Sequence, residues 1–358
     1  MPLSPAAAGA AEKTRRQSEE PQPSRAARPR ILTTHIKGWH PIWRDRTALL
    51  PGWEEEVART WGKVRSRSAW RDLVWAWRIF RLSTRYDVVI TGSERPSLIF
   101  ALLQHILRRK RVPHIFIECL WILPRGYLKR WRRRTLLRWV AQGAARIVVH
   151  ARRQVEAYEK AFDIAPGKFV FLRCQSSLYG ACYPVNTGDY IFAGGDSGRD
   201  YATLIEAVRD LPCRVMIAAL RRDHFRGLTL PANVQIVTLD PERFNLEMAG
   251  ARLVAVSLQR GLLHSGGHQG FENAMTLGKA VVVADDWAED YIEDGTTGVL
   301  VPAGSAGALR TALSRLLDDP ELVRLIGEKA KGASTAFAPE VFFEGVFRLV
   351  DECLQKQS

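Results

Sequence analysis

The feature that most constrains this chain is its alternation of short β-branched runs with longer stretches of helical periodicity. In the first half, these runs predict strands at residues 30–35, 87–91, 114–118, 146–150 and 169–172. The stretches between them predict helices at residues 69–81, 96–109, 127–142 and 152–162. Strands that alternate with helices of this length form βαβ units around a parallel sheet. We therefore expect an α/β fold.

A second alternating series follows residue 189. It predicts strands at residues 190–193, 214–219, 234–239, 253–258 and 280–284. Its helices are expected at residues 201–209, 271–277, 306–317, 320–331 and 339–355. Between the two series, residues 173–188 are rich in Ser, Gly, Pro and Asn and show no regular period, which is typical of a linker. Two α/β domains with a cleft between them are the expected architecture.

The chain has 358 residues, which is enough for two such domains. The predicted division is a tail (1–29), an N-terminal domain (30–175), a linker (176–188), a C-terminal domain (189–335) and a final helical segment (336–358). The tail has almost no large apolar residues to bury, so it is predicted to be disordered.

Charge separates the two halves. Residues 1–180 hold 35 basic and 14 acidic side chains, whereas residues 181–358 hold 17 and 24. Ten of the eleven Trp residues also precede residue 140. A basic, Trp-rich half beside an acidic half indicates two domains with different partners.

Several features predict a location in the cytoplasm. The five Cys residues show no C-x-x-C spacing, which argues against a disulfide framework or a zinc cluster and favours a reducing compartment. The tail lacks the apolar core of a signal peptide. The longest uncharged apolar stretch, 96–107, is far shorter than the roughly 20 residues that span a bilayer.

Two loops of the second series predict a phosphate site. Residues 194–199 follow a strand directly, and the loop combines Gly194, Gly195 and Gly198 with the five-donor side chain of Arg199. Glycine-rich turns also arise for steric reasons alone, and the loop is not the G-x-G-x-x-G fingerprint. The stronger loop, 264–270, places Ser265 and three glycines before a helix, where unpaired N–H groups meet the positive end of the helix dipole.

The segment 265–284, SGGHQGFENAMTLGKAVVVA, resembles the donor-binding segment of GT-B glycosyltransferases, and most closely the family-four group that uses nucleotide sugars. The resemblance continues through 291–302, YIEDGTTGVLVP, and into 316–321, LLDDPE. The 194–199 loop is similar to the phosphate loop of the same group. Together these motifs cover most of the C-terminal domain. The N-terminal domain resembles this group only in its alternation of strands and helices and in the strand at 146–150.

The resemblance implies that the C-terminal domain binds a nucleoside-diphosphate sugar as co-substrate, that the N-terminal domain binds the acceptor, and that the final helix packs back on the N-terminal domain. It assigns the donor to Gly194, Gly195, Arg199, Ser265, Gly266, Gly267, His268, Gln269 and Asn273. No cofactor and no bound metal are implied, because helix dipoles and basic side chains offset the charge of the leaving diphosphate. Asp285 and Asp286 are interpreted as a helix cap.

The sequence departs from the family pattern at two places. Two glutamates eight residues apart are common there, and the corresponding residues are Ser265 and Asn273. Asn273 can still hydrogen-bond a ribose hydroxyl, but Ser265 removes the carboxylate that contacts the transferred sugar. Glu272 lies one residue away, on a different helical face. The phosphate loop also keeps a single cation, Arg199, which Arg221 or Arg222 could assist.

The N-terminal domain offers three candidates for acid–base chemistry. Glu118 follows the predicted strand at 114–118 and could accept the proton of an acceptor hydroxyl, which makes it the predicted catalytic residue. The alternative is that Glu118 balances nearby arginines. His35 and Glu94 also follow predicted strands and are comparable candidates.

Two predicted helices are both basic and rich in Trp. Between residues 119 and 155 there are ten basic residues and no acidic one, and Leu128, Trp131 and Trp139 recur at helical spacing. The helix at 69–81 repeats this pattern. Basic amphipathic helices with Trp at their boundary are typical of helices that dock on anionic membranes. Two alternatives remain: the apolar stripe belongs to an ordinary core, or the charge serves nucleic acid, for which no recognised motif is present.

These observations predict a glycosyltransferase that acts on a glycan or lipid-linked acceptor, such as a cell-envelope precursor. It would be cytoplasmic and peripheral on the inner face of the membrane, without a nucleic-acid partner. The alternative is a catalytically inactive binding or scaffold protein with the same fold, which the loss of a carboxylate at Ser265 keeps open.

Overall fold

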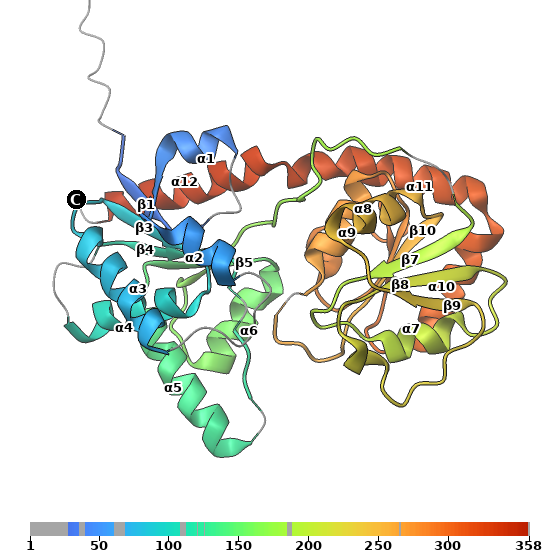
Figure 1. Cartoon of the computed structure of the whole chain (residues 1–358), viewed down its shortest axis with the longest axis horizontal. Coiled ribbons are helices and arrows are strands. Elements are labelled where there is room, and N and C mark those ends of the chain that lie inside the picture. Colours follow the sequence, from blue (N-terminus) through green and yellow to red (C-terminus); the bar gives the residue numbers. More distant parts are fainter. Residues whose placement is uncertain are drawn as a thin grey trace, which may run out of the picture.

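The computed structural model describes residues 28–35, 40–60, 69–107, 112–119, 121–124, 126–184, 188–264 and 266–356. These residues form two lobes, each built around a parallel sheet with helices on its faces (Figure 1). Residues 1–27 of the predicted disordered tail, and the site residue Ser265, lie outside the described ranges.

The N-terminal lobe contains a sheet of six described strands in the order β2-β1-β3-β4-β5-β6. Its strands are β1 (Ile31–Thr33), β2 (Thr47–Leu49), β3 (Val88–Thr91), β4 (His114–Phe116), β5 (Arg146–Val149) and β6 (Phe169–Phe171). Its helices are α1 (Pro41–Arg46), α2 (Trp53–Thr60), α3 (Ala69–Ser83), α4 (Arg95–Leu107), α5 (Tyr127–Gly143) and α6 (Arg152–Phe162). All the strand pairs are parallel.

The C-terminal lobe contains a second sheet of six described strands, in the order β12-β11-β10-β7-β8-β9. Its strands are β7 (Tyr190–Gly194), β8 (Arg214–Ala218), β9 (Val234–Val237), β10 (Leu253–Ser257), β11 (Val281–Ala284) and β12 (Val299–Val301). Its helices are α7 (Tyr201–Val208), α8 (Pro241–Gly250), α9 (His268–Thr276), α10 (Ala306–Asp318) and α11 (Pro320–Ala333). The last helix, α12 (Pro339–Gln355), follows α11 through a short 3-10 turn.

Every strand and helix that the sequence predicts is present, with ends that move by a few residues. The structure adds α1, β2, α2, α8 and β12. The two added strands have only three residues each, which is too short for a period of two to stand out. Helix α8 begins at Pro241. Its N-cap, Asp240, accepts a hydrogen bond from the Arg243 N–H, and an Asp-Pro pair of this kind is a start signal for a helix.

Helix α12 belongs by contact to the N-terminal lobe, although it ends the chain. Its apolar face supplies Phe343, Val346 and Phe347 to the core that also holds Ile31 and Ile115. Figure 1 shows α12 beside α1 and β1, at the opposite end of the molecule from β9. The last segment of the chain therefore joins the two lobes a second time, in addition to the linker.

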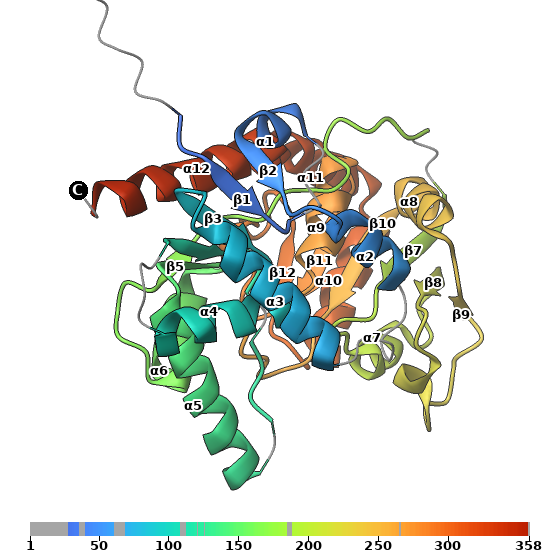
Figure 2. The same cartoon turned by 60° about the vertical axis from the view of Figure 1, so that its left-hand side comes forward.

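The order of the strands creates a switch point in each sheet. In the C-terminal sheet, β8 and β9 lie on one side of β7 while β10, β11 and β12 lie on the other, so the order reverses between β7 and β10. In the N-terminal sheet the reversal falls between β1 and β3. Loops diverge at such points, and open parallel sheets bind ligands there, beyond the carboxyl ends of the strands. Figure 2 shows the two lobes from a second direction.

Candidate functional site

The two predicted phosphate loops meet at the switch point of the C-terminal sheet. The first loop leaves β7 after Gly194, and the second leaves β10 after Ser257 and leads to α9. A β-bridge joins Arg199 to Leu258, and the Asp200 N–H donates to the Ser257 carbonyl at 2.9 Å. The loops are thus held together by backbone contacts, at the place where this sheet is built to bind a ligand.

Arg199 is the centre of this arrangement. Its side chain is buried, with an exposed fraction of 7%. Its Nε donates to the Gly194 carbonyl at 2.9 Å, and its Nη1 donates to the Ser197 carbonyl at 3.2 Å. Burial lowers the pKa of Arg199, and the neighbouring Tyr201 and Asp196 act in the opposite direction. A guanidinium of such high intrinsic pKa stays charged even so.

Glycines from both loops enclose this guanidinium. A Cβ at Gly195 would lie 2.8 Å from Arg199 Nη2, and one at Gly267 would lie 2.7 Å from Nη1. Gly195 has a φ of +104° and Gly267 a φ of +75°, values that favour glycine. A side chain at either position would displace the arginine, so the glycines here serve the placement of a buried cation.

The N-terminus of helix α9 lies beside the Arg199 guanidinium. Its N-cap is Gly267, and no side chain among the described residues caps it. The N–H groups of the first turn and the helix dipole therefore add to the positive potential of Arg199. A buried guanidinium next to an uncapped helix N-terminus is an arrangement that binds phosphate groups. Gly194, Gly195, Arg199, Gly266 and Gly267 all lie at this site.

His268 begins α9 and is buried beneath the loops. Its ring packs against Tyr291 at 4.7 Å between centroids and faces His150 edge-on at 6.1 Å. Burial lowers its pKa well below the ordinary value, so the ring is neutral. Its Nε2 is buried without a hydrogen-bond partner among the described residues, which leaves one polar atom available to a ligand.

Gln269 and Asn273, for which we predicted sugar or ribose contacts, bind the linker in this structure. Gln269 Nε2 donates to the Gln175 carbonyl at 2.6 Å. Asn273 Oδ1 accepts from Ser176 Oγ at 2.9 Å, and its Nδ2 donates to Ser177 Oγ at 3.0 Å. One face of α9 therefore fixes the linker between the lobes. A ribose contact by Asn273 would require it to exchange a serine hydroxyl for the ligand.

Glu272 is the residue that our sequence reasoning set aside. Its side chain is fully buried, and burial raises its pKa to about 8. Its Oε1 has no hydrogen-bond partner among the described residues, while Oε2 lies 3.4 Å from Gln269 Nε2. Burial therefore favours the protonated form of this carboxyl group, which lies beside Gln269. In the sequence, the only signal for Glu272 is its position beside Asn273, on a different helical face.

Arg221 and Arg222 follow β8, where we expected help for the phosphate site. Arg221 is paired with Asp223, with 2.6 Å between Nη2 and Oδ2. Arg222 Nη2 donates to Thr238 Oγ1 at 3.3 Å. Asp196 of the glycine loop accepts hydrogen bonds from the N–H groups of Leu220 and Arg221 and so ties the loop to the end of β8. Both guanidinium groups already have partners on their own edge of the sheet.

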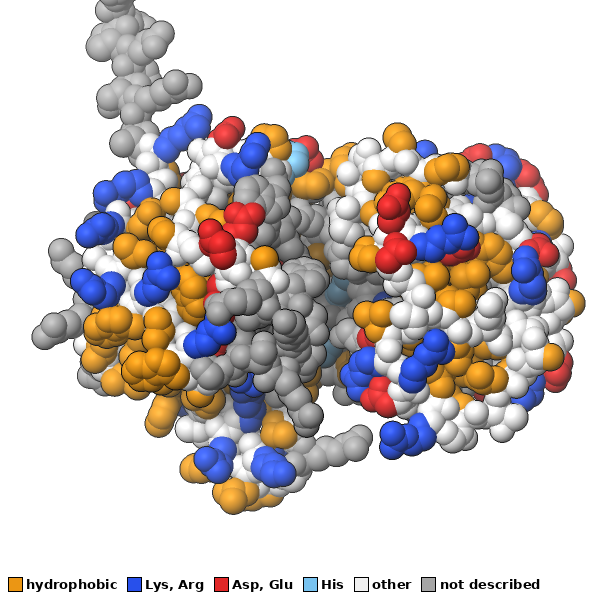
Figure 3. Space-filling model, in the orientation of Figure 1, with side chains coloured by type: hydrophobic (Ala, Val, Ile, Leu, Met, Phe, Trp, Pro, Cys, Tyr) orange, Lys and Arg blue, Asp and Glu red, His pale blue; other side chains and the backbone are white. Residues whose placement is uncertain are grey.

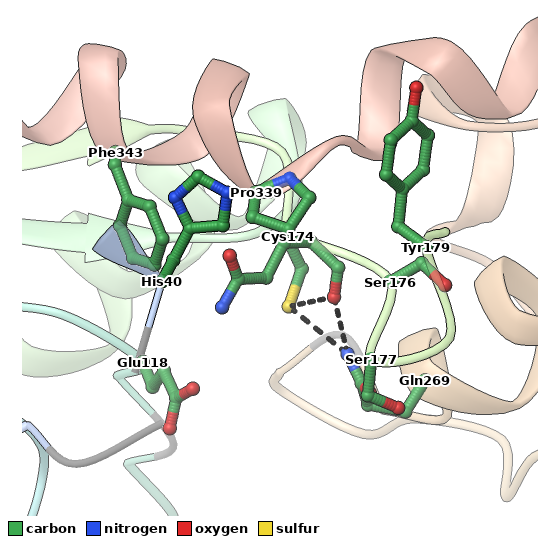
Figure 4. A pocket seen from close by; sticks show the side chains of 10 residues that line it. His40, Glu118, Cys174, Ser176, Ser177, Tyr179, Gln269, Pro339 and Phe343 are labelled. Carbon is green, nitrogen blue, oxygen red and sulfur yellow. Dashed lines mark hydrogen bonds between the residues drawn. The ribbon is translucent and has the colours of Figure 1, made fainter. Parts of the chain in front are cut away.

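Glu118 and Gln269 face each other across a pocket between the lobes. The pocket has a volume of about 420 Å³ and is also lined by His40, Cys174 and Ser177 (Figure 4). Glu118 follows β4 with a φ of +62°, a conformation that costs a non-glycine residue free energy. Ser93 Oγ donates to its carbonyl at 2.6 Å and holds this turn. Glu118 therefore lines the interlobe pocket from a strained turn.

The other N-terminal candidates lie at the switch point between β1 and β3. His35 is buried, and its ring meets Trp43 edge-on at 5.7 Å. Glu94 Oε2 accepts from Ser97 Oγ at 3.2 Å, in the first turn of α4. Neither lines the pocket that holds Glu118. A second interlobe cavity, of about 720 Å³, lies between residues 122–130 and 259–264 and is lined by Arg130, Arg260 and His264.

Tyr291 of the C-terminal lobe makes two hydrogen bonds to the N-terminal part of the chain. Its hydroxyl donates to the His150 carbonyl at 2.8 Å and accepts from the Cys174 N–H at 3.0 Å. Nearby, Arg152 pairs with Asp290, with 3.0 Å between Nε and Oδ1. Figure 3 shows a groove between the two lobes, with His side chains visible in it. Among the described residues, no group of three or more His, Cys, Asp or Glu could hold a metal ion.

The sequence matches no family model and no curated protein. Solved structures share its fold. Sucrose-phosphate synthase of Thermosynechococcus elongatus is 17% identical with a TM-score of 0.63, over 87% of this chain and 84% of its own. Anabaena HepE in complex with UDP and glucose is 16% identical with a TM-score of 0.66, over 90% and 100%. A Rickettsia africae glycosyltransferase is 14% identical with a TM-score of 0.63, over 92% and 99%.

Proposed function

The chain has the GT-B fold of two Rossmann-like domains, and from this premise we propose that it is a glycosyltransferase. Its C-terminal lobe binds a nucleoside-diphosphate sugar, and its N-terminal lobe presents the acceptor. The observation that carries the proposal is the buried Arg199, enclosed by the glycines of two loops at the N-terminus of α9. The arrangement suits a diphosphate, which needs several donors in a small space.

The proposed reaction needs positive charge at the leaving group. When the acceptor oxygen bonds to the anomeric carbon, the bond from that carbon to the diphosphate oxygen breaks and negative charge grows on the nucleotide. Arg199 and the first-turn N–H groups of α9 stabilise that charge without moving, which is how preorganised donors lower a barrier. His268 Nε2 has no hydrogen-bond partner among the described residues, and we expect it to hydrogen-bond the donor.

Glu118 is the proposed base. It lines the interlobe pocket from the N-terminal side, and its carboxylate would take the proton that the attacking hydroxyl loses. The strained φ of +62° supports a functional reason for its position, because strain of this kind concentrates at active sites. The acceptor hydroxyl would then lie between Glu118 and the face of α9 that carries Gln269 (Figure 4).

The acceptor is proposed to be a glycan or a lipid-linked precursor at an anionic membrane surface. The support comes from the apolar stripes of α3 and α5, whose Trp70, Trp77, Trp131 and Trp139 are between 46% and 72% exposed. Our alternative that these residues belong to the core is wrong for all four. Among the described residues, no helix is long and apolar enough to cross a bilayer, so contact would be peripheral.

Solved structures of the same fold suggest which nucleotide sugars to test first. The solved HepE complexes contain UDP, and one contains UDP-glucose. The pneumococcal O-GlcNAc transferase GtfA was solved with UDP and GlcNAc, at 13% identity and a TM-score of 0.53. UDP-sugars are therefore the first donors to test, and GDP-sugars the second.

One observation favours an inactive binding protein as the second candidate. Ser265 replaces the carboxylate that the family resemblance places beside the transferred sugar, and the neighbouring Glu272 is buried, with a pKa raised to about 8. Such a protein would bind the nucleotide sugar without consuming it.

Calorimetric titration with UDP-sugars and GDP-sugars, followed by a turnover assay with membrane lipid extract, separates the two functions. A glycosyltransferase binds one donor and releases its nucleotide while labelled sugar enters a new product. An inactive protein binds the donor and releases nothing. If no nucleotide sugar binds at all, both candidates fail.

A further inference from the structure

An apolar groove lies between α3, α4 and α5, away from the interlobe pockets. Its volume is about 380 Å³, within the range of small-ligand sites. Its walls include Leu98 and Leu102 of α4 and Leu136, Leu137 and Val140 of α5. Leu137 and Val140 are fully buried, whereas Leu136 is 39% exposed, so the groove runs from the core to the surface.

Charged side chains line one part of the groove. Asp72 of α3 is 3% exposed, and its Oδ2 lies 3.8 Å from Arg95 Nη1. Arg133 of α5 lines the groove as well, and burial together with the nearby Arg95 lowers its pKa. Asp72 pairs with Arg95, and no acidic side chain besides Asp72 lines the groove among the described residues, so the lining carries an excess positive charge.

The surface around the groove is apolar and basic. On α3, Trp70, Leu73, Val74 and Trp77 follow one helical face and are all at least 40% exposed. On α5, residues 127–136 include no buried side chain in the described structure, and that helix carries no acidic residue. Figure 3 shows hydrophobic side chains gathered over α3 and α4, with Lys and Arg beside them. Large exposed apolar patches mark interaction sites.

We propose that this groove binds an acyl chain of an anionic phospholipid, with the phosphate held by Arg95 and Arg133. The apolar walls suit the chain, the excess guanidinium suits the phosphate, and the exposed Trp residues suit the interfacial level of the bilayer. Charge decides against a second copy of this chain as the occupant. Two copies joined through this face would bring two α5 helices together, each basic and without an acidic residue.

This inference extends the membrane part of the proposed function and does not depend on glycosyl transfer. The test therefore uses the full chain without any nucleotide sugar. Dihexanoyl phosphatidylglycerol, below the concentration at which it forms micelles, is titrated by calorimetry. Glycerol 3-phosphate tests the headgroup alone, and dihexanoyl phosphatidylcholine tests the chains without net negative charge.

Leu102→Trp fills the groove, and Leu325→Trp on α11 is the matched control, because Leu325 is 41% exposed in the other lobe. A second variant, Arg133→Gln, removes the charge without adding volume. Thermal unfolding of each variant establishes that it folds. We expect one molecule of the anionic lipid per chain, at least tenfold weaker binding for Leu102→Trp and Arg133→Gln, and no change for Leu325→Trp.

Three results would overturn the proposal. Equal binding of glycerol 3-phosphate would mean a phosphate site without a chain. Equal binding of the phosphatidylcholine would mean that the guanidinium groups do not select an anionic lipid. Undiminished binding by folded Leu102→Trp would place the lipid outside the groove. Light scattering that showed a dimer dispersed by Leu102→Trp would make a second copy the occupant.

Discussion

The two lobes share one architecture and use it differently. Each has a parallel sheet with a switch point, but the C-terminal lobe surrounds its switch point with glycines, a helix N-terminus and one buried arginine. The N-terminal lobe places side chains such as His35 and Glu94 there, and it collects cations and Trp residues on α3 and α5. The proposed anion site therefore lies in the lobe with the lower positive charge, where local geometry and not net charge supports it. The proposed phosphate site lies in the acidic half of the chain and consists of backbone N–H groups and one cation, Arg199.

The largest expected effect tests the catalytic side of the comparison. Glu118→Gln keeps the size of the side chain but cannot accept a proton, so kcat should fall by roughly 10²–10⁴. Donor affinity should not change, because Glu118 lies in the N-terminal lobe. Steady-state kinetics and calorimetry check both parts. Loss of kcat by Glu94→Gln instead of Glu118→Gln would move the base to the N-terminal switch point.

A slightly smaller effect tests the donor side. Arg199→Ala removes the buried cation and should weaken binding of the nucleotide diphosphate by roughly 10²-fold, the scale of one preorganised donor. Arg222→Ala is the matched control, because its guanidinium donates to Thr238 instead. Calorimetry with UDP and GDP measures both. Equal losses for the two variants would mean that the lobe attracts the nucleotide by general charge.

The sequence predicted the framework of this comparison but not its contacts. The βα rhythm places Gly194 and the start of α9 at the ends of neighbouring strands because parallel strands share an edge. The partners of Gln269 and Asn273 were beyond reach, since Gln175 and Ser176 lie more than 90 residues earlier in the chain. Helical spacing on α5 showed that Leu128, Trp131 and Trp139 share a face. It could not show whether another element covers that face.

The basic surface of the N-terminal lobe should respond to charge reversal by a smaller factor. Lys129→Glu combined with Arg132→Glu removes two exposed cations from α5. Each contributes about 1 kcal/mol near an anionic bilayer, so binding to phosphatidylglycerol vesicles should fall at least about 30-fold. Co-sedimentation measures it, and Arg315→Glu with Lys329→Glu in the C-terminal lobe is the control. Equal losses for the two double variants would show that the surface cations of both lobes contribute equally to vesicle binding.

The smallest expected effect is on stability and concerns Glu272 of α9, beside the linker between the lobes. Burial raises the pKa of Glu272 from 4.5 to about 8, so the folded protein keeps a proton that the unfolded chain releases. Its contribution to the free energy of unfolding therefore falls as pH rises from about 4.5 to about 8, by at most about 1.4 kcal/mol per pH unit.

Glu272→Gln should flatten this pH dependence of the free energy of unfolding. Denaturant unfolding between pH 5 and 8 measures it, because the uptake of about one proton by Glu272 falls within that range. Glu293→Gln, which neutralises an exposed carboxylate of the same lobe, serves as the matched control in the same series. An unchanged slope in Glu272→Gln would mean that Glu272 is ionised in the folded state.

The central claim is that a nucleoside diphosphate binds at Arg199 and the N-terminus of α9. A crystal structure of the full chain soaked with UDP or GDP tests it most directly. The account predicts diphosphate oxygens within hydrogen-bond distance of the Arg199 guanidinium and of the first-turn N–H groups of α9. A nucleotide bound elsewhere, with Arg199 still donating only to Gly194 and Ser197, would contradict it.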